Sequence, residues 1–364
     1  MRSTVGLRRR TSAAIVCAGV IMAVAVANPA SGAARAHSAA KTLTPVTFGV
    51  PPNIVTGTAY LADAWGYFKQ YGIAPSFVTA PSGTLLTQAM IGGSINFATS
   101  SFYIPMQVAE KGQALQLVVG GYDSQATAVM VPTASSIATN APTRTVLTAL
   151  QGKRIGVAAL GSAQQTTFQA MLVENGLPSN YVTFIPVGVG ATAVAAFSAG
   201  EIDALFSSDP AIQILTGNHT AKIVIDQRPP KNQGGPIAKV PSVGTFATKA
   251  YIAANPQVTA GVVKALSLAL QRAHKYPAQA AKALETFPTY TATNSNEIIL
   301  ESCEGDASGF SPLITPKQIL TTSAVLEAGG VLTQLHTYQQ VVAAQYAKDW
   351  TIPLPGSKPT KKKG

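Results

Sequence analysis

Small polar residues and glycines recur in the loops that follow the predicted strands of this chain, where open α/β sheets bind ligands. These loops read Pro51-Pro52-Asn53, Ser82-Gly83-Thr84, Thr99-Ser100-Ser101, Tyr122-Asp123-Ser124, Gly161-Ser162-Ala163-Gln164, Gly188-Val189-Gly190 and Ser207-Ser208-Asp209. Several lead straight into helices, so free backbone N–H groups and the positive helix end would attract an anion without lysine or arginine. The sequence therefore predicts a site for a small polar ligand, anionic or zwitterionic, formed by Asn53, Ser82, Gly83, Thr84, Ser100, Ser101, Tyr122, Ser162, Gln164, Gly190, Ser208 and Asp209.

The same residue types also have a purely structural use. Serine, threonine and glycine serve as helix caps and turn residues, and Asp209 could cap the helix that starts at Pro210 instead of receiving an amine or hydroxyl of the ligand. Among the aromatic residues, Tyr103 and Tyr122 lie near strand ends and could cover a ligand. Four others are expected in the core of the first helical region, namely Tyr60, Trp65, Tyr67 and Phe68.

The alternative to a ligand-binding protein is an enzyme. The motif that best supports an enzyme is Gly-Val-Gly-Ala-Thr-Ala at residues 188–193. With Asp209 following, it resembles a dinucleotide-binding fingerprint. The corresponding turn at Ser82-Gly83 lacks that pattern, and a soluble nicotinamide cofactor is not expected outside the cytoplasm. The histidines are scattered without metal-ligand spacing, and no Gly-x-Ser-x-Gly elbow or Walker loop occurs. We therefore predict no enzyme activity, no cofactor, no metal site and no nucleic-acid partner.

An internal repeat defines the elements that must position the predicted site. Residues 76–101 and 183–208 align without a gap, pairing Gly83 with Gly190 and Ser100-Ser101 with Ser207-Ser208. Each copy reads as strand, glycine-bearing turn, small-residue helix and second strand, which is a βαβ unit. The repeat predicts an α/β fold of two similar lobes with mostly parallel sheets and a ligand cleft between them.

The order of predicted elements divides the chain into lobes. Residues 41–122 begin lobe 1, residues 123–226 form lobe 2, and residues 227–350 return to lobe 1 with the C-terminal helices, the hinge lying near residues 120–125 and 226–243. Asn255 is predicted to cap a helix that starts at Pro256, and Thr315 precedes another that ends at Gly329-Gly330. A last helix is expected over residues 338–349, and all these helices are expected to pack on lobe 1.

The two ends of the chain account for its basic character. Arginines and an apolar stretch at residues 13–27 predict a secretory signal peptide over residues 1–36, and residues 351–364 read as a disordered lysine-rich tail. These ends carry nine of the formal net charges of +11, so the body is nearly neutral. Cys303 is the single cysteine after the leader, which excludes an intramolecular disulfide. We expect an exported monomer located on the periplasmic or extracellular side of the cell envelope.

Three segments resemble the solute-binding proteins for sulfonates, nitrate, taurine and thiamine-pyrimidine precursors. They are Trp65-Gly66-Tyr67-Phe68-Lys69-Gln70-Tyr71-Gly72-Ile73, Leu150-Gln151-Gly152-Lys153-Arg154-Ile155-Gly156-Val157, and Ala199-Gly200-Glu201-Ile202-Asp203-Ala204 followed by Asp209-Pro210. The resemblance runs from about Thr47 to Ala280 and implies a type II periplasmic binding fold with an ABC-type membrane permease as partner.

The chain departs from that family in two ways that bear on its ligand. Trp65 stands where the family has an aliphatic residue, and the predicted cleft contains no arginine or lysine. A strongly charged dianion is therefore not expected, whereas a monoanionic sulfonate or carboxylate, a zwitterion and a neutral heterocycle stay open. An exported ligand sensor that docks on a receptor, and a dinucleotide-dependent enzyme, are the alternatives to an importer component.

Overall fold

The computed structural model describes residues 42–80 and 82–355. The predicted signal peptide, and residues 356–364 of the predicted tail, lie outside these residues. Within the described part of the chain, no helix is both long and apolar enough to span a membrane.

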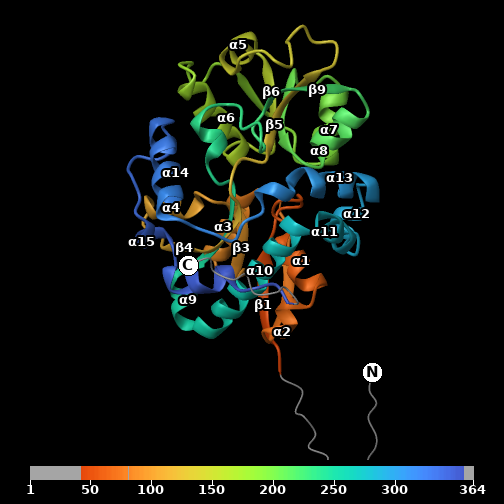
Figure 1. The fold of residues 1–364 in the computed structure, drawn as a ribbon. Coiled ribbons are helices and arrows are strands. Elements are labelled where there is room, and N and C mark those ends of the chain that lie inside the picture. The colour runs from red at the N-terminus through yellow and green to blue at the C-terminus, as the bar shows by residue number, and fades with distance from the viewer. Residues whose placement is uncertain (1–41, 81, 356–364) are drawn as a thin grey trace, which may run out of the picture. The chain divides into compact units, whose positions relative to one another are not determined.

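Two five-stranded sheets form the two lobes (Figure 1). The lobe 1 sheet has the order β2-β1-β3-β10-β4, and the lobe 2 sheet has the order β7-β6-β8-β5-β9. The strands of lobe 1 are β1 (Thr44–Gly49), β2 (Ile73–Val78), β3 (Phe97–Ser101), β4 (Leu115–Tyr122) and β10 (Val243–Thr248). Those of lobe 2 are β5 (Thr127–Pro132), β6 (Arg154–Val157), β7 (Thr183–Pro186), β8 (Ala204–Ser208) and β9 (Ala221–Asp226). These two lobes confirm the predicted α/β architecture.

The strand pairing is the same in both lobes. In lobe 1, β1 pairs in parallel with β2 and β3, while β10 runs antiparallel to β3 and β4. In lobe 2, β6 pairs in parallel with β7 and β8, while β5 runs antiparallel to β8 and β9. The strands β3 and β8 occupy the same place in their sheets, and each is the last strand of one copy of the predicted repeat. The repeat in the sequence is therefore also a repeat in the structure.

Helices cover both sheets because the strands are buried on their two faces. Phe48 of β1 packs on Phe68 and Phe97 with ring centroids 4.8 and 5.7 Å away, and Phe168 packs on Phe206 at 5.4 Å in lobe 2. The helices of lobe 1 include α1 (Thr58–Ala64), α2 (Tyr67–Gln70), α3 (Gly83–Ile91), α4 (Ile104–Ala109), α9 (Lys249–Ala254), α10 (Pro256–Lys275), α11 (Pro277–Leu284) and α12 (Pro288–Thr291). Those of lobe 2 are α5 (Thr143–Ala149), α6 (Ala163–Glu174), α7 (Ala191–Ser198) and α8 (Ala211–Gly217).

The C-terminal segments contact both lobes, which differs from the expectation that they pack on lobe 1. They comprise α13 (Asn296–Asp306), η2 (Ala307–Gly309), α14 (Pro316–Ala328), α15 (Tyr338–Val341) and η3 (Ala344–Thr351). Helix α10 packs on α1, α2 and β4 as expected. However, α13 contacts α8, and α14 contacts α6 and the short η1 (Pro236–Lys239) in the segment that returns from lobe 2.

Two predicted helix starts are confirmed, and one predicted helix end is wrong. Helix α10 starts at Pro256 with Asn255 at the N-cap position, but the Asn255 side chain does not cap the helix, because it donates to the carbonyl of Tyr251. The helix expected over residues 338–349 ends at Val341, since Val342 is extended and bridges to Leu117 of β4, at the edge of the lobe 1 sheet. Thr315 caps α14 with a reciprocal capping box, as predicted.

Candidate ligand-binding pocket

A cavity of about 110 Å³ lies between the two lobes, at the ends of β3 and β8. Its lining comes from the loops after the strands of both lobes and from the two segments that cross between them. The lining residues are Pro51, Asn53, Val55, Thr56, Ser82, Gly83, Ser100, Ser101, Tyr103, Gln125, Ala126, Thr127, Ala158, Ser162, Ala163, Gln164, Thr167, Val189, Ser208, Ser242 and Val243. None of these described residues carries a formal charge.

The structure brings together eight of the twelve residues predicted from sequence. These are Asn53, Ser82, Gly83, Ser100, Ser101, Ser162, Gln164 and Ser208. They meet because both copies of the repeat end their central strand at the same edge, β3 with Ser100-Ser101 and β8 with Ser208.

Four predicted residues lie outside the lining of the cavity. Thr84 is exposed in the first turn of α3, and Gly190 supplies the left-handed turn before α7 with φ of 57°, while its neighbour Val189 lines the cavity instead. Tyr122 is fully buried and donates a hydrogen bond to Asp306, so its hydroxyl points away from the cleft. Asp209 is also buried, and its partners are described below.

Sequence reasoning did not assign five polar residues of the lining: Thr56, Gln125, Thr127, Thr167 and Ser242. Gln125 and Ser242 lie on the two crossovers between the lobes, within the predicted hinge, and Thr127 begins β5. Gln125 and Ser242 could have been predicted, because both crossovers must pass close to a ligand that lies between the lobes. Tyr103, named from sequence as a residue that could cover a ligand, lines the cavity, and burial raises the pKa of its phenol to about 12, so it stays a neutral hydroxyl.

Each lobe presents one side-chain amide as a hydrogen-bond donor. The oxygen of Asn53 accepts from the backbone N–H of Thr56 at 3.1 Å, and the oxygen of Gln164 accepts from the backbone N–H of Ala158 at 2.6 Å. Because a backbone N–H can only donate, these contacts fix which end of each amide is the oxygen. Among the described residues neither NH₂ group has a protein partner, so both remain available to a ligand.

Gln125 supplies the opposite polarity from the crossover. Its NH₂ group donates to the carbonyl of Val240 at 2.9 Å, which leaves its oxygen as an acceptor. Two helices also begin at the cavity: Ser82 precedes α3 without a side-chain capping bond, and Ser162 caps α6 by accepting from Gln165. The pocket can therefore bind a ligand with several acceptors and at least one donor.

Gly83 is required where α3 begins. A Cβ atom at this position would overlap the hydroxyl of Ser100, because that side chain packs directly onto the glycine. Two predicted site residues from different strand ends thus depend on each other for their positions.

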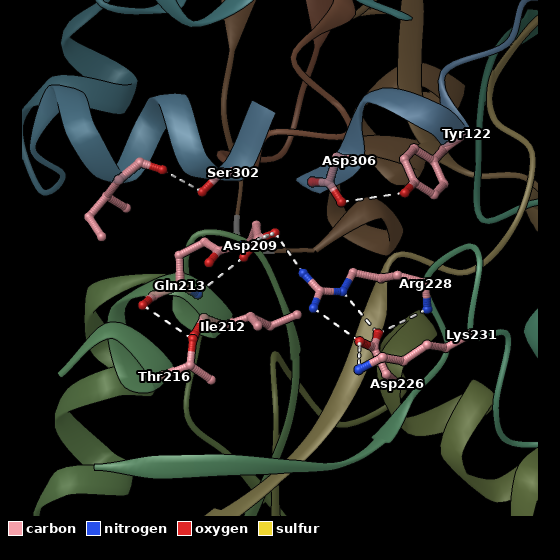
Figure 2. A network of polar contacts seen from close by, with 11 residues as sticks. Tyr122, Asp209, Ile212, Gln213, Thr216, Asp226, Arg228, Lys231, Ser302 and Asp306 are labelled. Carbon is pink, nitrogen blue, oxygen red and sulfur yellow. Dashed lines mark hydrogen bonds and ion pairs between the residues drawn. The ribbon is translucent and has the colours of Figure 1, made fainter. Parts of the chain in front are cut away.

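The charged residues nearest to the cleft form a separate buried network (Figure 2). Arg228 donates to Asp209 at 3.2 Å and to both oxygens of Asp226 at 3.0 and 3.2 Å. Asp209 also accepts from the backbone N–H of Gln213 in the first turn of α8, at 3.2 Å. The sequence left two roles open for Asp209, a helix cap or a ligand contact. The bond to Gln213 shows the capping role, at the start of α8.

Burial dominates the protonation of Asp209. It raises the pKa of this carboxyl to about 6, although Arg228 and the hydrogen bonds of Gln213 act in the opposite direction. A dinucleotide site at residues 188–193 would need Asp209 for the ribose, and here that side chain is bound to Arg228.

Comparisons with known proteins bear on the family and the fold. Residues 53–280 match the model of the family described as NMT1/THI5 like, and no curated protein sequence matched the chain. The fold is similar to that of a protein from Bordetella bronchiseptica RB50, with 23% sequence identity, a TM-score of 0.72, and coverage of 84% of this chain and 96% of that chain.

Two further solved structures have names that state a ligand. The alkanesulfonate-binding protein SsuA from Xanthomonas axonopodis pv. citri, bound to MOPS, has 20% identity and a TM-score of 0.64 over 83% of this chain and 97% of that chain. The periplasmic nitrate-binding protein NrtA from Synechocystis PCC 6803 has 12% identity and a TM-score of 0.64 over 86% and 92%. These likenesses confirm the periplasmic binding protein fold that the sequence resemblance implied.

Proposed function

The chain belongs to the NMT1/THI5-like family, and from this premise we propose that it is the extracytoplasmic solute-binding component of an ABC-type importer. In this proposal a leader over residues 1–36 is removed on export, residues 41–122 and 227–350 form one lobe, and residues 123–226 form the other. At the start of the predicted disordered tail, Thr351 instead ends η3, and the carbonyl of Ile352 accepts a hydrogen bond from Gln271. The protein acts as a monomer that delivers its ligand to a membrane permease.

One observation carries the proposal: the cavity is lined from both lobes by strand-end loops, and the side-chain NH₂ groups of Asn53 and Gln164 lack protein partners among the described residues. Asn53 belongs to lobe 1 and Gln164 to lobe 2, so each lobe contributes one donor amide to the lining. A ligand that engages both donors favours the conformation in which the lobes meet, which is how ligand binding shifts a two-lobed protein to its closed state.

The lining favours a compact anionic or zwitterionic organic ligand such as a small sulfonate. Donor amides, hydroxyls and two helix starts stabilise negative charge, while the absence of lysine and arginine among the described lining residues disfavours a dianion. A cavity of about 150 Å³ is enough for benzene, so the cavity of about 110 Å³ suits a ligand of only a few heavy atoms.

The lining offers little for catalysis. Among the described residues at the cavity, none is a histidine, cysteine, aspartate, glutamate or lysine, so a general base or an activated nucleophile is missing there. Binding without turnover is the expected behaviour, and an exported sensor that docks on a receptor is the alternative with the same pocket.

A thermal-shift screen with sulfonates, taurine, nitrate, pyrimidines and aromatic acids tests the proposal. A ligand at 100 times its Kd should stabilise the protein by about 2.7 kcal/mol and raise its Tm, with the ligand recovered unchanged. No shift with any compound, together with a cofactor-dependent reaction, would establish the enzyme hypothesis instead. If genes for a permease and an ATPase were found beside this one, they would favour the importer over the sensor.

Gln164→Glu tests the charge of the ligand directly. The substitution keeps an oxygen for the N–H of Ala158 but replaces the donor NH₂ with a negative oxygen, so an anionic ligand should bind about 10- to 100-fold more weakly. The matched control is Gln165→Glu on the same helix, whose oxygen accepts from Gly161 outside the cavity lining. Tighter binding to Gln164→Glu would identify a cationic ligand and contradict the proposed ligand class.

A further inference from the structure

The two lobes meet a second time at the end of α13, where lobe 1 contacts the start of α8 in lobe 2. A Cβ atom at Gly305 would lie 3.7 Å from Oδ2 of Asp209 and 3.8 Å from Nη1 of Arg228. The next residue, Asp306, is fully buried at this contact, and Figure 2 shows it across from Asp209 and Arg228.

Negative charge exceeds positive charge inside this contact. Asp209, Asp226 and Asp306 are all buried, whereas Arg228 is the one cation that the described residues bury with them. Lys231 pairs with Asp226 at 3.4 Å, but its side chain is 59% exposed. All three nitrogen atoms of the Arg228 guanidinium bind Asp209 and Asp226, so Asp306 shares in no ion pair.

Asp306 has the hydrogen bonds of an uncharged group. Its Oδ1 accepts one bond of 3.4 Å from the hydroxyl of Tyr122, and its Oδ2 has no partner among the described residues. An ionised buried carboxylate needs several donors or a cation, and without them its charged form is strongly disfavoured.

Apart from Arg228, the groups that act on Asp306 are acids or hydroxyls, and His274 of α10, which acts on Asp123, is exposed. Tyr122 of β4 and Cys303 of α13 both have a pKa raised by burial, so both are neutral. Asp123, beside Tyr122, and Glu304, on α13 itself, are acids. Burial, followed by the negative charge of Asp209, raises the pKa of Asp306 well above its ordinary range, with Arg228 acting in the opposite direction.

We propose that Asp306 carries a proton while α13 contacts lobe 2, and that separation of the lobes hydrates and ionises it, so that lobe closure takes up a proton. This inference goes beyond the proposed function, because it requires no ligand. The closed form binds the proton more tightly, so closure is favoured at low pH. As the pH rises above the ordinary range of an aspartate, near 3.8, the equilibrium constant for opening should increase by up to about tenfold per pH unit until the closed form also ionises.

Infrared difference spectroscopy of the ligand-free protein tests where the proton lies. The spectrum of the wild type minus that of Asp306→Asn at pH 5, where the closed form is favoured, should contain the C=O stretch of a protonated carboxylic acid. Tyr122→Phe should shift the frequency of that band, because it removes the one hydrogen bond that the acid accepts. The absence of the band, or a spectrum with only carboxylate bands, would overturn the proposal.

Distance measurements test the coupling to lobe motion. Spin labels at Lys111→Cys in lobe 1 and Lys153→Cys in lobe 2, both exposed, report the separation of the lobes, while Cys303 is buried. The open fraction of the labelled wild type should grow between pH 5 and pH 8, and Asp306→Asn, which mimics the neutral acid, should remove this growth.

Two control variants separate Asp306 from other acids. Asp203→Asn, at an exposed ion pair with Arg154, should leave the pH response intact. Glu174→Gln tests the acid near the return crossover, whose pKa burial raises to about 7. A response that persists in Asp306→Asn, or that disappears in Glu174→Gln alone, would assign the switch to another group and contradict the proposal.

Discussion

The pocket and the charged contact at α13 are two places where the lobes meet, and they are built from opposite chemistry. The pocket has hydroxyls, amides and free space but no formal charge among its described residues. The contact at α13 buries three acids, Asp209, Asp226 and Asp306, with one guanidinium, and Arg228 forms ion pairs with Asp209 and Asp226. The groups available to a ligand therefore lie in the pocket, and the charged groups lie in the contact at α13.

This separation explains how a nearly neutral pocket can lie beside strong charges. Asp209 follows Ser208 directly, yet Ser208 lines the cavity while Asp209 is bound by Arg228 and by the first turn of α8. Buried ion pairs hold a unique geometry at little net gain in stability. Selectivity for the ligand is therefore expected to come from hydrogen-bond direction and size rather than from a counter-ion.

Removing Arg228 should have the largest effect on stability. Arg228→Ala leaves Asp209 buried without a cation and Asp226 with only the exposed Lys231, which should lower the free energy of unfolding by about 3–5 kcal/mol at pH 7. Urea denaturation measures this loss, which should shrink as the pH falls and the carboxyls become protonated. Arg154→Ala, at an exposed ion pair, is the control and should change little. If both variants lost the same free energy of unfolding, the buried ion pairs of Arg228 would be no more important for stability than the exposed pair of Arg154.

Gly83→Ala should damage the pocket and leave the charged contact intact. The new methyl group overlaps the hydroxyl of Ser100, so overpacking should cost about 1–3 kcal/mol in stability, and the affinity for a ligand found in the screen should fall at least tenfold. Calorimetric titration measures the affinity. Gly217→Ala is the matched control, because a Cβ atom there meets nothing within 4 Å. Unchanged affinity in Gly83→Ala would show that the ligand binds elsewhere.

Glu174→Gln tests a buried acid that belongs neither to the pocket lining nor to the charged contact at α13. Oε2 of Glu174 accepts from the backbone N–H of Ile237, Oε1 has no partner among the described residues, and burial raises the pKa to about 7. Since the folded-state pKa lies above the ordinary value, the acid costs stability as the pH rises from about 4.5 through 7.

The glutamine should therefore stabilise the protein at pH 8 by about 1 kcal/mol, a figure reduced for partial solvation, and should change nothing at pH 4. Thermal unfolding at the two pH values measures the difference. The same gain at both pH values would mean that packing, rather than ionisation, accounts for it.

Tyr122→Phe should have the smallest effect and bears on a residue that sequence placed in the ligand site. Loss of the 3.4 Å hydrogen bond to Asp306 should cost about 0.5–1 kcal/mol, and the ligand affinity should not change. Denaturation and titration of the same sample measure both. A marked loss of affinity would return Tyr122 to the ligand site.

The sequence allowed prediction of the two lobes, the repeat and most of the strand-end residues, because these depend on local patterns. Ser100 and Ser208 follow from the rule that ligands bind at the carboxyl ends of strands. Tyr122 and Asp209 also lie at strand ends, but their environments depend on Asp306 and Arg228, which pack against them only in the folded chain. The wrong helix after Val341 has the same origin, since the edge of β4 pairs with Val342 and no local pattern reports that edge.

The position of β10 sets an order for folding. This strand lies between β3 and β4, yet in the chain it follows the whole of lobe 2. During synthesis the sheet of lobe 2 can therefore be completed first, whereas the first half of lobe 1 waits with two unpaired strand edges until residues 243–248 arrive. Contacts between residues so distant in sequence form slowly, so the N-terminal lobe is expected to be the last to become native.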